Sequence, residues 1–127
     1  MSQAVEFPDI IGHLCVWLED ALRANGYPTA RVDDVYHGDK AEVWLQRDGG
    51  PTLDVVREVA RVRVNCFHDL DVEAFTSRVA ALLRVAANGA PIVRAEQVGG
   101  STPITDVKPR RLLTFEFTFR GAPLTLA

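Results

Sequence analysis

The 127-residue sequence has few cysteines, no long hydrophobic run and no large excess of charge of either sign. Its two cysteines, Cys15 and Cys66, both fall on the apolar side of an expected element, which predicts reduced, buried thiols and no disulfide framework. No stretch approaches the ~18 consecutive apolar residues of a membrane-spanning helix, and the first six residues do not resemble a secretory signal. We therefore expect a soluble protein made in a cytoplasm.

The chain also has little that indicates chemistry. With 17 acidic and 14 basic residues, its net charge of -3 disfavours tight binding to nucleic acid. His13, His37 and His68 lack the short spacings of zinc ligands, and no cysteine cluster accompanies them. Ser101 and Thr102 follow two glycines but precede no helix and lack the lysine of a phosphate-binding loop. The sequence thus predicts no metal, cofactor or catalytic site, and a protein that is not an enzyme.

Hydrophobic residues make up 47% of the chain, enough for one compact domain over residues 1–127. Apolar residues recur every three or four positions from Pro8 to Asn25, which predicts an amphipathic helix. A second such stripe begins after Asp69 or Asp71, either of which is a suitable cap, and ends at Asn88. Both stripes predict helices with one buried side.

Five segments have strand-like patterns, and a turn-rich loop is expected from Gly99 to Pro109. The strands are predicted at Ala30–Tyr36, Glu42–Arg47, Glu58–Phe67, Pro91–Val98 and Arg110–Arg120. This order of elements predicts an α+β fold: a mixed, mainly antiparallel sheet of four or five strands with both helices packed on one face.

Alternation within the strands predicts which side chains face the core. In the third strand Ala60, Val62, Val64 and Cys66 alternate with the outward-facing Arg61, Arg63 and Asn65. The last strand directs Leu113 and three phenylalanines to one side. Trp44 alternates with Val43 and Leu45, so it is expected on the polar face of its strand.

The ensemble resembles a known family. Its parts are the leading amphipathic helix, the strand REVARVRVNCF, the acid-capped helix DLDVEAFTSRVAALLRVA and the ending VGGSTPITDVKPRRLLTFEFTFRG. In these features, which cover almost the whole chain, the sequence is similar to the tail terminator, or tail completion, proteins of siphovirus-type long-tailed bacteriophages.

The resemblance implies a structural virion protein that is assembled in the bacterial cytoplasm and needs no cofactor. It implies a ring, hexameric in the family, that caps the head-proximal end of the tail tube and stops its growth. The expected partners are further copies of the chain, the major tail tube protein and a head-completion or connector protein, with DNA passing through the lumen without specific binding. Another head-tail connector is the first alternative, and a small ligand-binding domain or enzyme is the second.

Some residues are candidates for the subunit or partner interface. Trp44 is either an interface anchor or packs under an N-terminal segment. Arg61 and Arg63 either pair across an interface or are solvated on the sheet face. The loop and the residues beside it form either a partner-docking segment or a plain connector, and their candidates are Asp106, Lys108, Arg110 and Arg111.

An acidic run is the last candidate feature. It comprises Asp33, Asp34, Asp39 and Glu42. In a ring these carboxylates are suited to line a lumen through which DNA passes, whereas in any other protein such a run is usually a solvated face.

Overall fold

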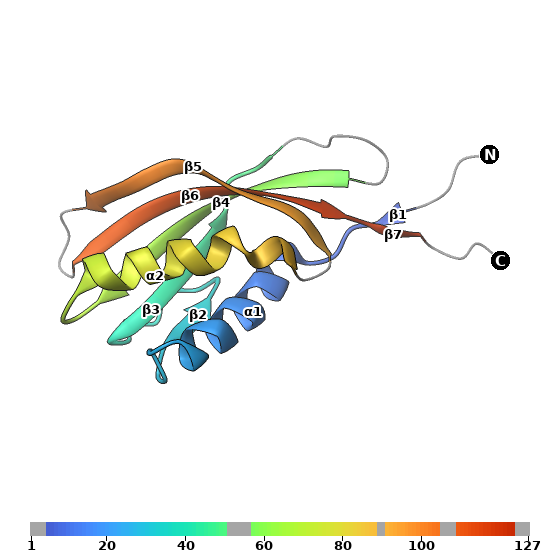
Figure 1. Cartoon of the computed structure of the whole chain (residues 1–127). Coiled ribbons are helices and arrows are strands. Elements are labelled where there is room, and N and C mark those ends of the chain that lie inside the picture. The colour runs from blue at the N-terminus through green and yellow to red at the C-terminus, as the bar shows by residue number, and fades with distance from the viewer. Residues whose placement is uncertain (1–4, 51–56, 89–90, 105–108, 124–127) are drawn as a thin grey trace.

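The computed structural model describes residues 5–50, 57–88, 91–104 and 109–123. Its main sheet has five strands in the order β2-β3-β4-β6-β5, of which only the pair β2–β3 is parallel. These strands are, in that order, Arg31–Asp33, Ala41–Arg47, Arg57–His68, Arg110–Arg120 and Ile92–Ile104. Both α-helices lie on one face of the sheet (Figure 1), so the predicted α+β class and its layer arrangement are confirmed.

Helix α1 spans Ile10–Ala24 and packs against β2 and β3. It starts two residues later than predicted, because Asp9 is the N-cap and its Oδ1 accepts a hydrogen bond from the Gly12 N–H at 3.0 Å. The cap also explains the glycine inside the helix. A Cβ at Gly12 would lie 2.6 Å from Oδ2 of Asp9.

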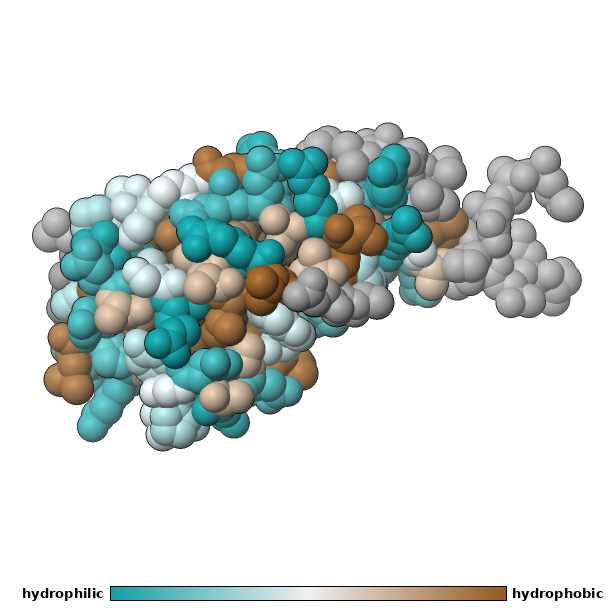
Figure 2. All heavy atoms as spheres, in the orientation of Figure 1, coloured by the Kyte–Doolittle hydropathy of each residue, from teal (hydrophilic) through white to brown (hydrophobic). Residues whose placement is uncertain are grey.

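Helix α2 spans Val72–Arg84 and packs against β4, β5 and β6. Its N-cap is Asp71, whose Oδ1 accepts from the Ala74 N–H at 3.0 Å, so of the two predicted caps the structure selects the second. The helix ends before the predicted Asn88, and residues 86–88 form a single 3₁₀ turn, η1. The visible surface over the two helices mixes hydrophilic and hydrophobic residues (Figure 2).

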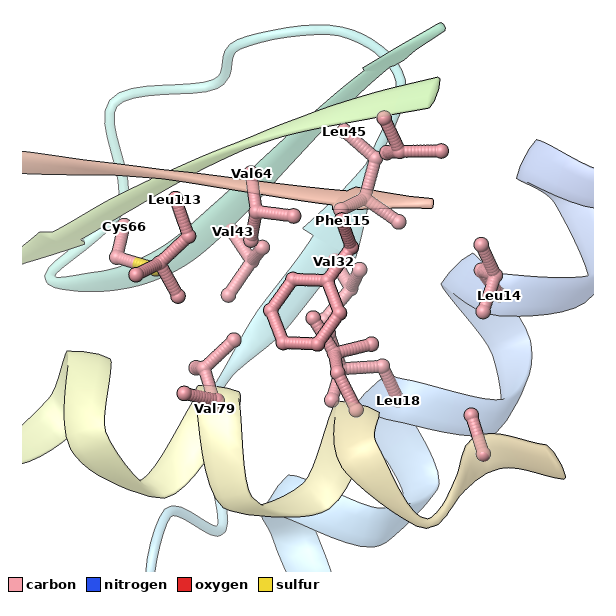
Figure 3. Close-up of a cluster of buried hydrophobic side chains, with 14 of the residues drawn as sticks. Leu14, Leu18, Val32, Val43, Leu45, Val64, Cys66, Val79, Leu113 and Phe115 are labelled. Carbon is pink, nitrogen blue, oxygen red and sulfur yellow. The ribbon is translucent and has the colours of Figure 1, made fainter. Parts of the chain in front are cut away.

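The core lies between the helices and the covered face of the sheet. Figure 3 shows side chains of β3, β4 and β6, including Val43, Val64 and Phe115, directed toward Leu14 and Leu18 of α1 and Val79 of α2. The predicted inward alternation of β4 and β6 is confirmed, since Cys66 and the three phenylalanines are buried. Burying such side chains stabilises the fold by roughly 1.5–3 kcal/mol each.

Strand β5 is longer than predicted. The loop expected from Gly99 to Pro109 is therefore wrong over residues 99–104. Residues 99–104 continue the strand, with Thr102, Pro103 and Ile104 opposite Leu112, Arg111 and Arg110 of β6. Register shifts on both sides of Gly99 accommodate the glycines as irregularities in the ladder. Pro103 is tolerated because β5 lies at the edge of the sheet.

Strand β2 is shorter than the predicted Ala30–Tyr36 and ends at Asp33. Residues 34–40 instead form a crossover to β3, which runs parallel to β2. Backbone groups of this crossover are bound by Glu42 and Trp44, two side chains on the sheet face opposite the helices. The crossover therefore lies over one end of the uncovered face.

A two-stranded arm was not predicted. It pairs β1, Val5–Glu6, with β7, Ala122–Pro123, and projects from the body of the molecule (Figure 1). Gly121 permits the close approach, since a Cβ there would overlap Val5 and the Glu6 carbonyl. Phe7 anchors the base of the arm by an edge-to-face contact with Phe119, at 5.8 Å between ring centroids.

Candidate interaction surfaces

The main candidate surface is the uncovered face of the five-stranded sheet. The register places Gln46, Arg63 and Thr114 in one row across β3, β4 and β6, and Trp44, Asn65 and Leu112 in the next. Asn65 was expected to face solvent, but it is only 1% exposed. Its amide donates to the Trp44 carbonyl and to the Gln46 side chain, both at 3.1 Å, so the centre of this face is ordered by hydrogen bonds.

Four side chains form what we call the aromatic patch: Tyr36, Trp44, Phe67 and Arg110. The Tyr36 ring lies 4.8 Å from Phe67 and 6.1 Å from Trp44 between centroids, and the Arg110 guanidinium lies 5.7 Å from the Phe67 centroid. Tyr36 remains 43% exposed and Trp44 is half-buried. Phe67, beneath them, is only 3% exposed, so Tyr36, Trp44 and Arg110 form the accessible part of the patch. Tyrosine, tryptophan and arginine are the types enriched at interface anchors.

Trp44 lies on the polar face, as the alternation predicted, and among the described residues, which begin at Val5, no N-terminal segment packs over it. Its indole N–H donates to the carbonyl of Asp34 at 3.1 Å, so the ring holds the crossover. Trp44 therefore has a structural contact within the chain, and its interface role stays a prediction. Tyr36 was not a candidate, because the sequence placed it at the end of the predicted strand Ala30–Tyr36, whereas β2 ends at Asp33 and Tyr36 lies in the crossover.

The two arginines of β4 differ in their surroundings. Arg61 forms an ion pair with Glu116 of β6, at 2.9 Å between Nη2 and Oε1, so the cross-strand neighbour within the chain already satisfies its charge. Arg63 is exposed, and in the described part of the chain it has no ion pair or hydrogen bond. Of the two, Arg63 is the better interface candidate.

The arginines at the start of β6 lie on opposite faces of the sheet. Arg110 belongs to the aromatic patch, whereas the Arg111 guanidinium donates to the Ser101 hydroxyl of β5 at 3.0 Å. They therefore do not form one docking group. Asp106 and Lys108 lie outside the described residues.

Glu42 was predicted to be one of the acidic residues that line a lumen, and its position in the structure contradicts this prediction. Its side chain is fully buried and accepts hydrogen bonds from the backbone N–H groups of His37, at 2.6 Å, and Asp39, at 2.9 Å. A carboxylate that binds two backbone donors in the interior cannot line a lumen. The sequence could not separate Glu42 from the other three acidic residues, because a run of charges does not show which side chain is buried.

The other acidic side chains are nearer to solvent, and two of them are paired. Asp33 Oδ2 lies 2.6 Å from His37 Nε2, and this hydrogen bond is the main reason that the pKa of Asp33 is lowered. Asp39 Oδ2 pairs with Arg31 at 2.7 Å. Together with Asp34 these residues remain lumen candidates, with much of their charge offset locally.

Both thiols are free, as predicted, but they differ in burial. Burial raises the pKa of Cys66 to about 12. Cys15 is only half-buried; burial and then the negative charges of Asp33 and Asp34 raise its pKa to about 12. The thiolate of either residue is therefore scarce near neutral pH.

Two further features escaped the sequence analysis. A groove of about 920 Å³ lies at the base of the β1–β7 arm, with Phe7, Ile92, Val93, Arg120 and Gly121 among its lining residues. Leu70, between β4 and α2, is 92% exposed. The groove exists only because distant segments meet, whereas a single leucine beside a predicted cap gave no signal of its exposure.

Within the described ranges no group of three or more His, Cys, Asp or Glu side chains is arranged to hold a metal ion. No helix in that part of the chain is long and apolar enough to cross a bilayer. A comparison with models of known protein families gives no match, and a comparison with curated proteins gives none either. Functional inference therefore rests on the surfaces described above.

Proposed function

We propose that this chain is a structural virion protein of the tail-terminator type, which associates with copies of itself into a hexameric ring at the head-proximal end of a phage tail tube. In that position the ring stops polymerisation of the tube and offers a surface to a head-completion protein. The proposal starts from the resemblance of the sequence to that family. It adds no catalytic step.

The observation that supports it best is the uncovered face of the sheet. One face is closed by α1 and α2, while the other presents the aromatic patch and the unpaired Arg63 in the described part of the chain. An antiparallel sheet can face water on one side, but aromatic side chains and arginine on that side are more typical of a protein contact than of a solvated surface. This favours a protein that works by binding other proteins.

Ring closure requires two different complementary surfaces on each subunit. The molecule has distinct ends: the crossover over the uncovered face lies at one end of β4, and the arm lies at the other (Figure 1). Such polarity suits heterologous association better than a self-complementary contact.

The decisive test is assembly of tail tubes from the purified major tail tube protein of the same phage, with and without this chain. We expect substoichiometric amounts of the chain to stop elongation and to appear as an annulus at one tube end by electron microscopy. Size-exclusion chromatography with light scattering gives the oligomeric state in solution. Tubes of unchanged length with no bound chain would contradict the proposal.

A further inference from the structure

The uncovered face of the sheet carries a strip of positive charge, although the chain as a whole is acidic. Side chains on a strand alternate between the two faces, so the register of β4, β5 and β6 assigns each charged residue to one side. On these three strands the uncovered side receives two glutamates and six arginines, namely Arg57, Arg61, Arg63, Arg94, Arg110 and Arg120. We call the six arginines the arginine strip.

The strip and the rest of the molecule have opposite charge. The six arginines exceed Glu96 and Glu116 by four charges, whereas the other eight basic and fifteen acidic residues of the chain leave an excess of seven negative charges. Strand β3 adds no exposed charge beside the strip, since Trp44 and Gln46 are uncharged and Glu42 is buried. The net charge of -3 therefore combines a basic sheet face with an acidic remainder.

Both glutamates on this side are already engaged by arginines of the strip. Glu116 Oε1 lies 2.9 Å from Nη2 of Arg61, and Glu96 Oε2 lies 3.1 Å from a guanidinium nitrogen of β5. Arg63 and Arg120 are exposed, and neither side chain has an ion pair or hydrogen bond with a described residue. Their charges are available to a partner.

At the arm end of the strip, two arginines lie directly opposite each other. Arg57 of β4 pairs in register with Arg120 of β6, and like charges directly opposite on neighbouring strands are destabilising. Glu6 and Asp9 line the groove beside Arg120, but neither forms an ion pair with it, and the Asp9 carboxylate caps α1. A carboxylate from another molecule, placed between the two guanidiniums, relieves their repulsion.

The spacing of the strip suits separate carboxylates better than a chain of phosphates. Arg57 and Arg63 lie six residues apart on β4, about 20 Å at ~3.3 Å per residue, and Glu116 lies between them on β6. A nucleic-acid backbone along β4 would pass beside this glutamate and meet repulsion from the acidic remainder of the chain. A protein surface can place carboxylates at the two ends only, and a guanidinium binds a carboxylate through two parallel hydrogen bonds.

We propose that copies of this chain associate through the arginine strip, which binds an acidic surface of the next copy. The strip and the acidic remainder are two different complementary surfaces on one chain, as a heterologous contact requires, and repeated heterologous contacts can close a ring. Trp44 and Leu112, in the row next to Arg63, add apolar contact. This inference rests on the proposed self-assembly and specifies the chemistry of its interface.

Light scattering on the purified chain tests the contact. The double variant Arg63→Glu with Arg120→Glu should associate about tenfold more weakly or worse, because it reverses two charges of the strip. Its melting temperature should not fall, since both side chains are exposed and without a partner in the described ranges, and a glutamate at position 120 faces Arg57.

Arg78→Glu with Arg84→Glu is the matched control on α2, on the other side of the sheet. These changes remove a hydrogen bond to the Asn25 carbonyl and one to the Gln97 side chain, but they make the remainder of the chain more acidic. The control should therefore associate at least as well as wild type.

Mixing the strip variant with wild type tests whether the contact is heterologous. The variant keeps its acidic surface, so a tagged copy should capture wild-type chains although it does not associate with itself. A peptide of about ten glutamates, which reaches about 33 Å when extended, should compete with this capture.

Unchanged self-association of the strip variant, or its failure to capture wild type, would overturn the inference. Tighter binding of a single-stranded oligothymidylate than of the glutamate peptide would also overturn it, by assigning the strip to nucleic acid. If the wild type assembles and stops tube growth while the strip variant assembles equally well, the interface is wrong and the proposed ring stands. A wild-type chain that neither assembles nor stops tube growth would contradict the proposed function itself.

Discussion

Glu42 illustrates how one side chain determines the shape of a surface. It alternates with Val43 on a strand, and its polarity predicted exposure, yet the crossover folds back over it. Burial of a charged carboxylate is tolerated because two backbone N–H groups replace its water, and hydrogen bonds to a charged group contribute more than neutral ones. The residue therefore organises the loop that carries Tyr36.

Glu42→Ala should destabilise the chain by about 2–4 kcal/mol, because two buried backbone donors lose their acceptor. Chemical denaturation monitored by tryptophan fluorescence measures the change. Asp20→Asn, at an exposed site on α1, is the matched control and should lie within about 0.5 kcal/mol of wild type. If both variants had the same free energy of unfolding, the Glu42 carboxylate would not be what holds the crossover in place.

At the scale of elements, the sequence predicted both helices and the central strands, because their hydrophobic periods match one buried side of each. It failed where tertiary pairing overrides local pattern. Gly99, Gly100 and Pro103 are loop residues by composition, but pairing with β6 extends β5 through them. The β1–β7 arm was equally invisible, since two residues per strand give no periodic signal.

The two glycines of β5 give a matched pair of substitutions. Gly99→Ala should cost about 1–3 kcal/mol, because its Cβ would lie 3.0 Å from the Thr114 Cβ on the neighbouring strand. Gly100→Ala meets nothing within 4 Å and should be neutral or slightly stabilising. Thermal unfolding by circular dichroism separates the two. A loss of stability at Gly100 as large as at Gly99 would mean that the ladder is not paired in this register.

On the scale of the whole molecule, alternation placed Trp44, Arg61 and Arg63 on the correct face, but it could not show which of them is available for a contact with another protein. This availability depends on partners 10 to 55 residues away, such as Glu116 for Arg61 and Asp34 for Trp44. The groove at the base of the arm and the exposed Leu70 depend on how the ends of the sheet are built. A local pattern therefore predicts a face, whereas the tertiary structure decides which of its residues are available to a partner.

Arg63→Glu tests the uncovered face as a contact for neighbouring proteins. Because Arg63 is exposed and unpaired in the described ranges, the variant should keep the melting temperature of wild type while its activity in stopping tube growth falls at least tenfold. Arg84→Glu makes the same charge change on α2, on the opposite side of the sheet; it also removes the hydrogen bond from Arg84 to the Gln97 side chain, but it should retain activity. Particles with Arg63→Glu that have tails of normal length and remain infectious would remove this residue from the contact. A lower melting temperature would instead assign Arg63 to the stability of the sheet, since an interface residue should affect association and leave the isolated fold unchanged.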